Sequence, residues 1–207
     1  MTTHPPLRTL IDLVTQANAG TLCEAAGDAR SYVVPIEAYG QFYHGGPSAV
    51  REIDPSLLQQ MDSGYYGEGF YAGKTWDFAA SWSGAGSIVT TFTLRPGSRI
   101  LKAGVDGSKA ADGLLQALRD FHYTRSLKAI ETTDGRARKE AEQKLSGQLE
   151  LLAFPHHVSH YTKIVNDFAR ELRVQGIDRG EEVVIIDHAA YRFLYADRAE
   201  AGNFRGR

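Results

Sequence analysis

The stretch Glu182-Val-Val-Ile-Ile-Asp187 is a short apolar run enclosed by acidic residues, with Gly180 just before it. A run of β-branched residues bounded by a turn signal is typical of a strand that is buried on both faces. A buried strand needs partner strands beside it and other elements over its faces. The run therefore predicts a buried sheet strand in the C-terminal part of the chain.

The remaining elements follow from similar patterns along the chain. Runs rich in β-branched and aromatic residues predict further strands over residues 30–36, 41–44, 87–94, 99–101 and 191–195. Apolar residues at helical spacing predict helices over residues 5–19, 55–61 and 75–83, and a helical insertion with three helices over about 102–175. The segment from 45 to 73 is rich in Gly, Ser, Asp and Pro and is interpreted as a loop around the helix at 55–61. We therefore expect an α+β protein with strands at both ends and a helical insertion between them.

The composition excludes several functional classes. The 23 Lys and Arg residues are balanced by 25 Asp and Glu residues, so no general positive field attracts nucleic-acid backbones. The single cysteine, Cys23, excludes an internal disulfide and a cysteine-based zinc site. No signal peptide is visible, and no apolar run approaches the roughly 18 residues that a membrane span needs. We expect one domain that acts in the cytoplasm, of its own cell or of a cell into which it is delivered, without membrane contact.

Three separated segments combine glycines with polar or aromatic residues. In Phe42-Tyr-His-Gly-Gly46 a strand ends in a histidine and two glycines, whose backbone groups a ligand can approach closely. The segment from Gly64 to Gly73 interleaves glycines with aromatic residues, but lacks the context of a dinucleotide fingerprint or a phosphate loop. Gly180-Glu-Glu182 places two carboxylates at the entrance of the buried strand. Singly, each has a plain structural explanation: a hydrogen-bonded histidine, a packed turn and a solvated strand end.

Taken together and in this order, the segments resemble the H-Y-E group of ADP-ribosyltransferases, the clan of poly(ADP-ribose) polymerases and diphtheria toxin. His44-Gly45 is similar to the His-Gly of that family, Gly67-Glu-Gly69-Phe-Tyr71 to its Gly-x-Gly-hydrophobic-Tyr, and Glu182-Val-Val-Ile-Ile-Asp187 to its glutamate strand. Trp82 lies where members commonly carry a second stacking aromatic residue. The resemblance implies a split β-sheet core, NAD+ as co-substrate, no metal, and Gly69 among the cofactor-binding residues.

The resemblance also implies a role for each matched residue. Glu182 would be the catalytic carboxylate, which holds the 2′-hydroxyl of the nicotinamide ribose and stabilises the oxocarbenium-like transition state. Tyr71 and Trp82 would stack on the nicotinamide ring. The backbone of Gly45 would bind the carboxamide, and His44 would bind the adenine-side ribose.

Two departures from the family pattern affect these expectations. The family often has a serine that bonds the carboxamide eight residues after the tyrosine, and here that position is Ala79. We expect Ser81 or Ser83 to supply the missing hydroxyl, with Ser81 counted among the cofactor-binding residues. The residue two before Glu182 is Gly180, where arginine-modifying relatives carry glutamate, so arginine is a less favoured acceptor.

The leading hypothesis is an NAD+-dependent mono-ADP-ribosyltransferase similar to bacterial toxins and effectors, which releases nicotinamide and modifies a protein or a nucleic acid. We expect the insertion at about 102–175 to read that acceptor, and an antitoxin or immunity protein is a candidate partner. A second hypothesis makes water the acceptor, which gives an NAD+ glycohydrolase. A third is a catalytically silent module that binds ADP-ribose, RNA or a protein. A related RNA 2′-phosphotransferase would need several basic side chains around the donor, which the sequence does not reveal.

A histidine-rich segment offers an alternative site. His156 and His160 lie four residues apart, a spacing that suits metal ligands on one helix face. No third ligand and no zinc-protease glutamate accompany them. A helix start lined by imidazoles is therefore the favoured interpretation, and no metal is expected.

Overall fold

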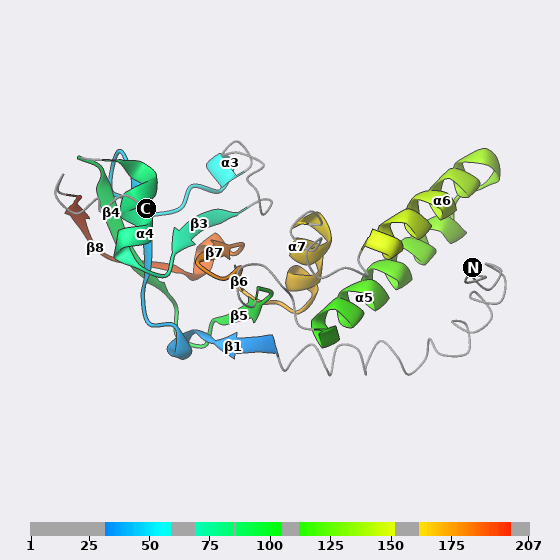
Figure 1. Ribbon diagram of the computed structural model, residues 1–207, viewed down its shortest axis with the longest axis horizontal. Helices are drawn as coiled ribbons and strands as arrows, with labels where there is room; N and C mark the ends of the chain where they lie inside the picture. The colour runs from blue at the N-terminus through cyan, green and yellow to red at the C-terminus, as the bar shows by residue number, and fades with distance from the viewer. Residues whose placement is uncertain (1–31, 59–68, 85, 105–111, 152–161, 200–207) are drawn as a thin grey trace.

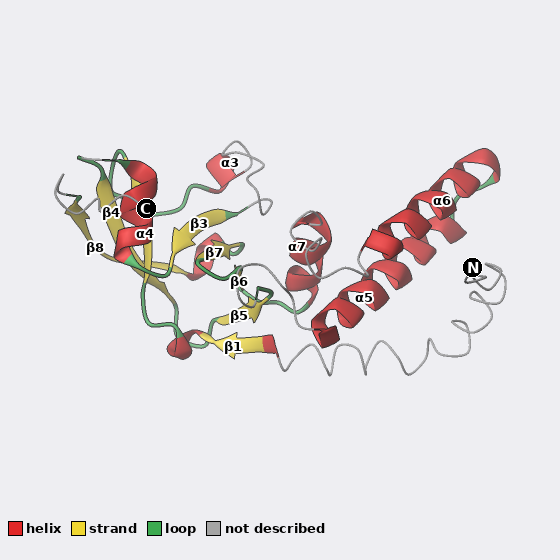
Figure 2. Cartoon of the chain, in the orientation of Figure 1, coloured by secondary structure: helices red, strands yellow, loops and turns green. Residues whose placement is uncertain are grey.

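The computed structural model describes residues 32–58, 69–84, 86–104, 112–151 and 162–199 of the chain (Figures 1 and 2). The strands are β1 (Val33–Pro35), β2 (Phe42–Gly46), β3 (Phe70–Gly73), β4 (Ile88–Leu94), β5 (Arg99–Lys102), β6 (Gly176–Asp178), β7 (Glu182–Ile185) and β8 (Tyr191–Arg198). The helices are α3 (Pro55–Leu58), α4 (Trp76–Ser83), α5 (Asp112–Glu131), α6 (Gly135–Leu151) and α7 (Thr162–Glu171), with short 3-10 turns η2 (Ile36–Ala38) and η4 (His188–Ala190). The predicted α+β class is confirmed.

The strands form one mixed sheet that is not closed into a barrel. Its order is β1-β5-β6-β7-β3-β2-β4-β8, so β7 lies inside the sheet as its apolar sequence predicts. Val183, Val184 and Ile185 are fully buried. Neighbouring strands are antiparallel except β5 and β6, which are parallel.

The pairing between neighbouring strands is shortest between β3 and β2. These strands share the single residue pair Tyr43 and Gly73. The junction separates a β3 half, made of β1, β5, β6, β7 and β3, from a β2 half, made of β2, β4 and β8. In Figure 1, β4 runs steeply, whereas β1 lies almost level and β3 and β5 are inclined less steeply than β4, so strand direction changes across this junction.

Packing on the sheet defines three cores. One face carries an aromatic cluster in which Phe92 contacts Phe42 and Phe70, with ring centroids 5.7 Å and 5.6 Å away. α4 covers the other face of the β2 half through Ala79 and Ala80. α5 and α7 pack on β5 and β6 in the third core.

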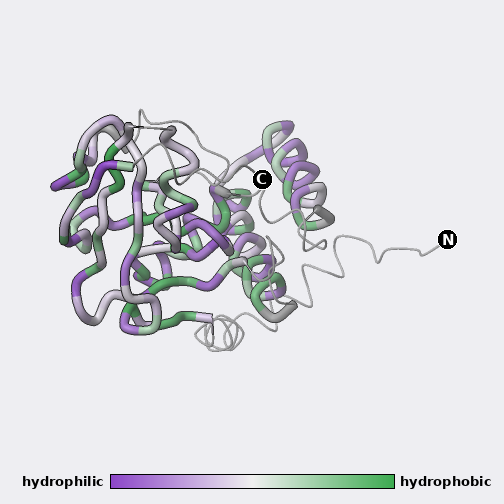
Figure 3. The backbone as a smooth tube through the Cα atoms, turned by 60° about the vertical axis from the view of Figure 1, so that its left-hand side comes forward, coloured by the Kyte–Doolittle hydropathy of each residue, from purple (hydrophilic) through white to green (hydrophobic). Residues whose placement is uncertain are grey.

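The helices α5, α6 and α7 lie between β5 and β6, in the range where a helical insertion is predicted. α5 and α6 form a pair that extends away from the sheet (Figure 1), and His122 Nε2 lies 3.0 Å from Gln148 Oε1 between them. In Figure 3, hydrophilic and hydrophobic residues are interspersed along these helices. None of the described helices is long and apolar enough to cross a membrane.

The structure corrects the interpretation of residues 45–73 as a loop, because β3 occupies Phe70–Gly73. It also contains β6, which the sequence pattern did not predict. β3 is only four residues long and has Ala and Gly at two of them, so local propensity for a strand is weak. Its pairing with β2 on one side and β7 on the other supplies the stabilisation. The predicted helix at 5–19, Cys23 and the segment with His156 and His160 lie outside the described residues.

Candidate functional site

The three segments that carry the motifs lie on adjacent strands. Tyr43 of β2 is opposite Gly73 of β3, and Gly73 is opposite Glu182 of β7, so the three form a row across the sheet. Tyr71 is opposite Val184. Directly opposed residues share a face of a sheet, and so do residues two apart on one strand. Tyr71 and Glu182 therefore lie on the same face.

His44 alternates with Tyr43 and lies on the other face, where its ring packs 4.4 Å from that of Phe70. Its Nδ1 donates a hydrogen bond of 2.8 Å to the carbonyl oxygen of Tyr71. Because a carbonyl oxygen only accepts, Nδ1 carries the proton. Burial lowers the pKa of His44, although the hydrogen bond to Tyr71 opposes that shift. The neutral imidazole thus links β2 to β3 beyond their one backbone pair and leaves Nε2 as an acceptor for a ligand hydroxyl.

Gly45 lies where the two strands separate. On one side it is opposite Val89 of β4. On the other side, pairing with β3 ends at Tyr43, so no described strand covers that backbone edge of Gly45 and Gly46. A Cβ atom at Gly45 would collide with the carbonyl oxygen of Ala79 in α4. Only glycine therefore permits this close approach of α4, beside an open backbone edge.

The serine hydroxyl beside Gly45 comes from Ser83. A Cβ atom at Gly45 would also collide with Ser83 Oγ, which lies 3.2 Å from the Ala79 carbonyl oxygen and 2.7 Å from Ser87 Oγ. Ser81 is exposed, and its hydroxyl donates to the carbonyl oxygen of Phe78 within the same helix. Both hydroxyls thus bond carbonyl oxygens of α4, and Ser83 differs from Ser81 in that its hydroxyl lies beside Gly45.

The two predicted stacking residues have different surroundings. Trp82 remains 73% exposed and packs on Phe78, with ring centroids 5.9 Å apart. Tyr71 is half-buried on β3. Phe78 also covers Gly73, since a Cβ atom there would lie 2.7 Å from Phe78 Cδ1. An exposed indole supported by a second ring leaves a face on which a planar ligand can stack.

Glu182 is half-buried at the start of β7. Burial raises the pKa of its carboxyl group, and the neighbouring charge of Glu181 raises it further. Within the described residues, no hydrogen bond or ion pair holds this carboxylate. Glu181 itself is exposed, as expected from strand alternation. Glu182 is thus a partly desolvated acceptor for a hydroxyl group or a developing positive charge.

Gly69 serves the packing of β3 on β7. A Cβ atom there would collide with the side chain of Val184 and lie 3.0 Å from the carbonyl oxygen of Ile185. Gly69 lies directly before β3, so the close packing that it allows helps to place Tyr71 opposite Val184. Gly67 and Glu68 of the same motif lie outside the described residues.

Two features near this site were not predicted from the sequence. Phe78 could have been noticed from its spacing of one helical turn from Trp82. The other feature is an ion pair between Lys74 and Asp178 behind the Glu182 strand. No local sequence pattern predicts that ion pair, because its partners are 104 residues apart.

Searches against protein-family models, curated proteins and solved structures find no match for this chain. In the ranges that the structure describes, no cluster of three or more His, Cys, Asp or Glu side chains could hold a metal ion. What the site does must be inferred from its own residues and their geometry.

Proposed function

We propose that this protein transfers ADP-ribose from NAD+ to a macromolecular acceptor and releases nicotinamide, as mono-ADP-ribosyltransferase toxins and effectors do. The observation that carries the proposal is the meeting of the three motif segments on β2, β3 and β7. Tyr71 and Glu182 share a face, and His44 is bonded to the Tyr71 carbonyl oxygen. The single pair between β2 and β3 also supports the split-sheet core that the resemblance implies.

The site residues suit NAD+ as a ligand. The open backbone edge of Gly45 can bond the carboxamide, which offers both a donor and an acceptor. Trp82 and Tyr71 offer aromatic faces to the cationic nicotinamide ring. His44 lies on the sheet face opposite Glu182, so its Nε2 acceptor would receive a ribose hydroxyl at the strand end where β2 and β3 separate.

The reaction requires a group that stabilises positive charge. When the bond between C1′ and the nicotinamide nitrogen breaks, its electron pair leaves with nicotinamide and C1′ becomes oxocarbenium-like. The acceptor then forms the new bond to C1′ and loses a proton. Glu182 would accept the 2′-hydroxyl hydrogen bond and stabilise the cationic centre. Its half-buried position strengthens this interaction relative to water.

We assign acceptor binding to the helical insertion. A hollow of about 610 Å³ opens between α5 and α7, with Phe121 and Phe168 at its apolar part. Arg125, Lys128 and Asp167 add charges of both signs to its lining. A hollow with apolar and charged parts suits a macromolecular surface of mixed character. We further propose that the protein acts in a cytoplasm, its own or that of a target cell.

The test uses NAD+ labelled in its adenylate part. Wild type, Glu182→Ala and the neighbouring control Glu181→Ala are each incubated with it, alone and with cell lysate, and the protein and RNA fractions are counted separately. The proposal expects label in one fraction with wild type and Glu181→Ala, and none with Glu182→Ala. Free ADP-ribose alone would replace the transferase with an NAD+ glycohydrolase. Intact NAD+ in every sample would overturn both the transferase and the glycohydrolase. It would favour the hypothesis of a catalytically silent binding module.

A further inference from the structure

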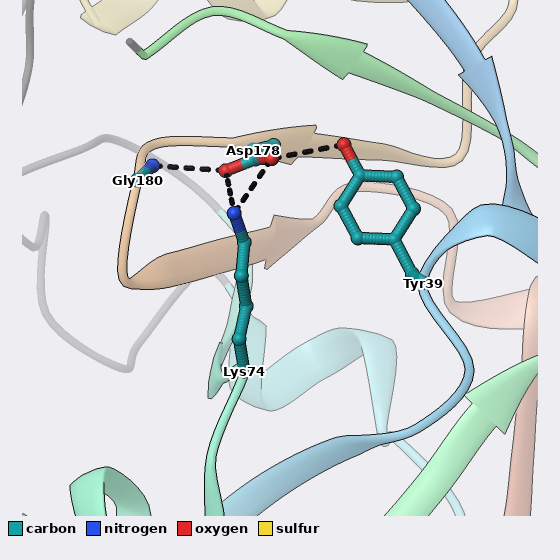
Figure 4. A network of polar contacts seen from close by, with 4 residues as sticks. All are labelled: Tyr39, Lys74, Asp178 and Gly180. Carbon is teal, nitrogen blue, oxygen red and sulfur yellow. Dashed lines mark hydrogen bonds and ion pairs between the residues drawn. The ribbon is translucent and has the colours of Figure 1, made fainter. Parts of the chain in front are cut away.

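A network of polar contacts surrounds the end of β6 and the loop that connects it to β7, the strand that carries Glu182 (Figure 4). Its centre is the carboxylate of Asp178, the last residue of β6, whose side chain is 1% exposed. Lys74 Nζ lies 2.6 Å and 2.7 Å from its two oxygens. The Tyr39 hydroxyl and the Gly180 backbone N–H each donate to it over 2.9 Å. One buried carboxylate therefore joins three separate parts of the chain.

The network holds the loop that leads directly into Glu182. Arg179 N–H donates to the Glu182 carbonyl oxygen over 2.8 Å, which closes a hairpin with the two-residue loop Gly180-Glu181. Gly180 has a φ of 103°, a conformation that favours glycine and suits such a loop. Lys74 N–H donates to the Glu181 carbonyl oxygen over 3.1 Å. Lys74 thus holds the loop through its backbone and, by way of the network, through its side chain.

The ion pair and the Glu182 side chain lie on opposite faces of the sheet. Asp178 is opposite Val183, which belongs to the aromatic core. Glu182 alternates with Val183 and is opposite Gly73 on the other face. A substrate beside the Glu182 carboxylate would therefore be separated from Asp178 by the sheet.

Stability alone does not explain an ion pair at this place, in which the Asp178 side chain is buried and the Lys74 side chain is 32% exposed. The desolvation of two charges largely offsets their attraction, and apolar residues of similar volume often stabilise a fold equally well. The pair instead supplies bonds with fixed directions. Asp178 bonds Gly180 in the loop and Lys74 at the end of β3, so the distance between the loop and β3 is fixed.

We propose that the Lys74–Asp178 ion pair positions Glu182 for its reaction by fixing the Gly180-Glu181 loop against the end of β3. Both are positioning residues that act through the hairpin and do not touch the substrate. The catalytic consequence rests on the proposed function. The effect on Glu182 itself does not, because its carboxyl group can be titrated without any turnover.

The test separates positioning from stability with a double variant. Lys74→Met alone leaves the buried Asp178 carboxylate without its cation, so we expect its Tm to fall clearly below that of wild type. Lys74→Met with Asp178→Leu removes both charges, so we expect its Tm to return to within about 5 °C of wild type. The control removes an ion pair on exposed α6, Arg136 with Glu140, by changing both residues to Ala. Tyr39→Phe is a milder variant that deletes one bond to Asp178 and keeps the ion pair.

Two readouts are compared in these proteins: kcat and KM for nicotinamide release, and the titration of the Glu182 carboxyl carbon by NMR. In the double variant we expect kcat to fall about 10- to 100-fold, because a displacement near 1 Å can cost that much, with KM for NAD+ changed less than about threefold. The titration of Glu182 should move toward its ordinary range, since a loosened loop admits water to the carboxylate. Tyr39→Phe should shift both readouts in the same direction by less, and the α6 control should shift neither.

The outcomes distinguish this inference from the proposed function. A folded double variant with wild-type kcat and wild-type titration of Glu182 overturns the positioning role. If the double variant does not fold, unchanged kcat and titration in Tyr39→Phe overturn it. If wild type releases no nicotinamide, the proposed function fails, and the titration still decides whether the pair holds Glu182.

Discussion

The loop before Glu182 and the strand end at Gly45 lie on either side of the candidate site, and they are held in opposite ways. The Gly180-Glu181 loop is fixed by backbone bonds and by the buried carboxylate of Asp178. The Gly45 end is paired with β4 on one edge, and no described strand covers the other. The group that would perform chemistry is thus set before a ligand arrives, whereas the groups that would bind the ligand are left open to it.

The two regions are joined narrowly. In the described part of the chain, one residue pair, Tyr43 with Gly73, and one imidazole bond from His44 to Tyr71 link the two halves of the sheet by hydrogen bonds, and the aromatic core packs across the junction. A substitution on one side should therefore affect mainly the property of that side. We expect rate to depend on the Glu182 side and NAD+ affinity on the Gly45 side.

The largest expected effect concerns the charge of Glu182. Glu182→Gln keeps the shape of the side chain and removes its charge. We expect kcat for nicotinamide release to fall by about 10²- to 10³-fold, the usual loss when one group that stabilises transition-state charge is removed. Because this interaction forms mainly in the transition state, Kd for NAD+ should stay within about threefold. Chromatography of released nicotinamide and calorimetry measure the two. A loss of affinity with unchanged kcat would assign Glu182 to the binding side.

The next largest effect tests the close approach at Gly45. Gly45→Ala should lower the free energy of unfolding by about 1–3 kcal/mol, because the new methyl group displaces the backbone of α4. Affinity for NAD+ should fall with it. Gly147→Ala in α6 is the matched control, since no atom lies within 4 Å of its Cβ position. Denaturant unfolding of both variants gives the comparison, and equal stability of the two would mean that α4 does not press on Gly45.

A smaller effect is expected at Trp82, which is 73% exposed. Trp82→Ala should leave the free energy of unfolding within about 0.5 kcal/mol of wild type, as surface substitutions usually do. Loss of one stacking face should weaken NAD+ binding by about 5- to 10-fold. Tyr195→Ala, at an exposed aromatic residue of β8, should not change the affinity. Fluorescence titration with NAD+ measures it, and equal affinities would remove Trp82 from the site.

The smallest effect concerns pH. In the proposed reaction Glu182 acts in its charged form, so its raised pKa should place the acid limb of kcat above the ordinary value of 4.5. Glu181→Gln removes one cause of the shift, so the limb should move to lower pH. The folded-state pKa lies above the unfolded-state value, so this group favours folding at low pH and loses that contribution as pH rises through the folded-state pKa. Rate profiles and thermal melting check both directions. If Glu181→Gln does not move the acid limb of the rate profile, that limb reports the titration of a group other than Glu182.

Much of the fold follows from the sequence where local signals are strong. The apolar run Val183–Ile185 is a central strand, and Thr75 caps α4 by accepting from Phe78 N–H over 3.3 Å. β3 escapes prediction because Phe70-Tyr-Ala-Gly73 is stable as a strand only between its two neighbours. The Lys74–Asp178 ion pair could not be predicted from the sequence for the same reason. Its partners meet only after β3 and β6 have taken their places in the sheet.

The candidate site is likewise only partly predictable from the sequence. The motif residues mark which strands take part, and the structure places His44, Gly45, Tyr71 and Glu182 on three neighbouring strands. Sequence spacing does not decide between Ser81 and Ser83, because both are near the end of one helix. The place of each side chain on α4 decides it, because Ser83 lies against Gly45 whereas Ser81 is exposed, and this depends on how α4 packs over Gly45.

The most direct test of the central claim is an NMR titration of NAD+ into the isotope-labelled Glu182→Gln variant, in which turnover is suppressed. We predict saturable shifts, with a common Kd, of the backbone amides of Gly45 and Gly46 and of the amide at position 182. Both sides of the site would then respond to one ligand. Shifts confined to other parts of the chain, or no shifts at millimolar NAD+, would contradict it.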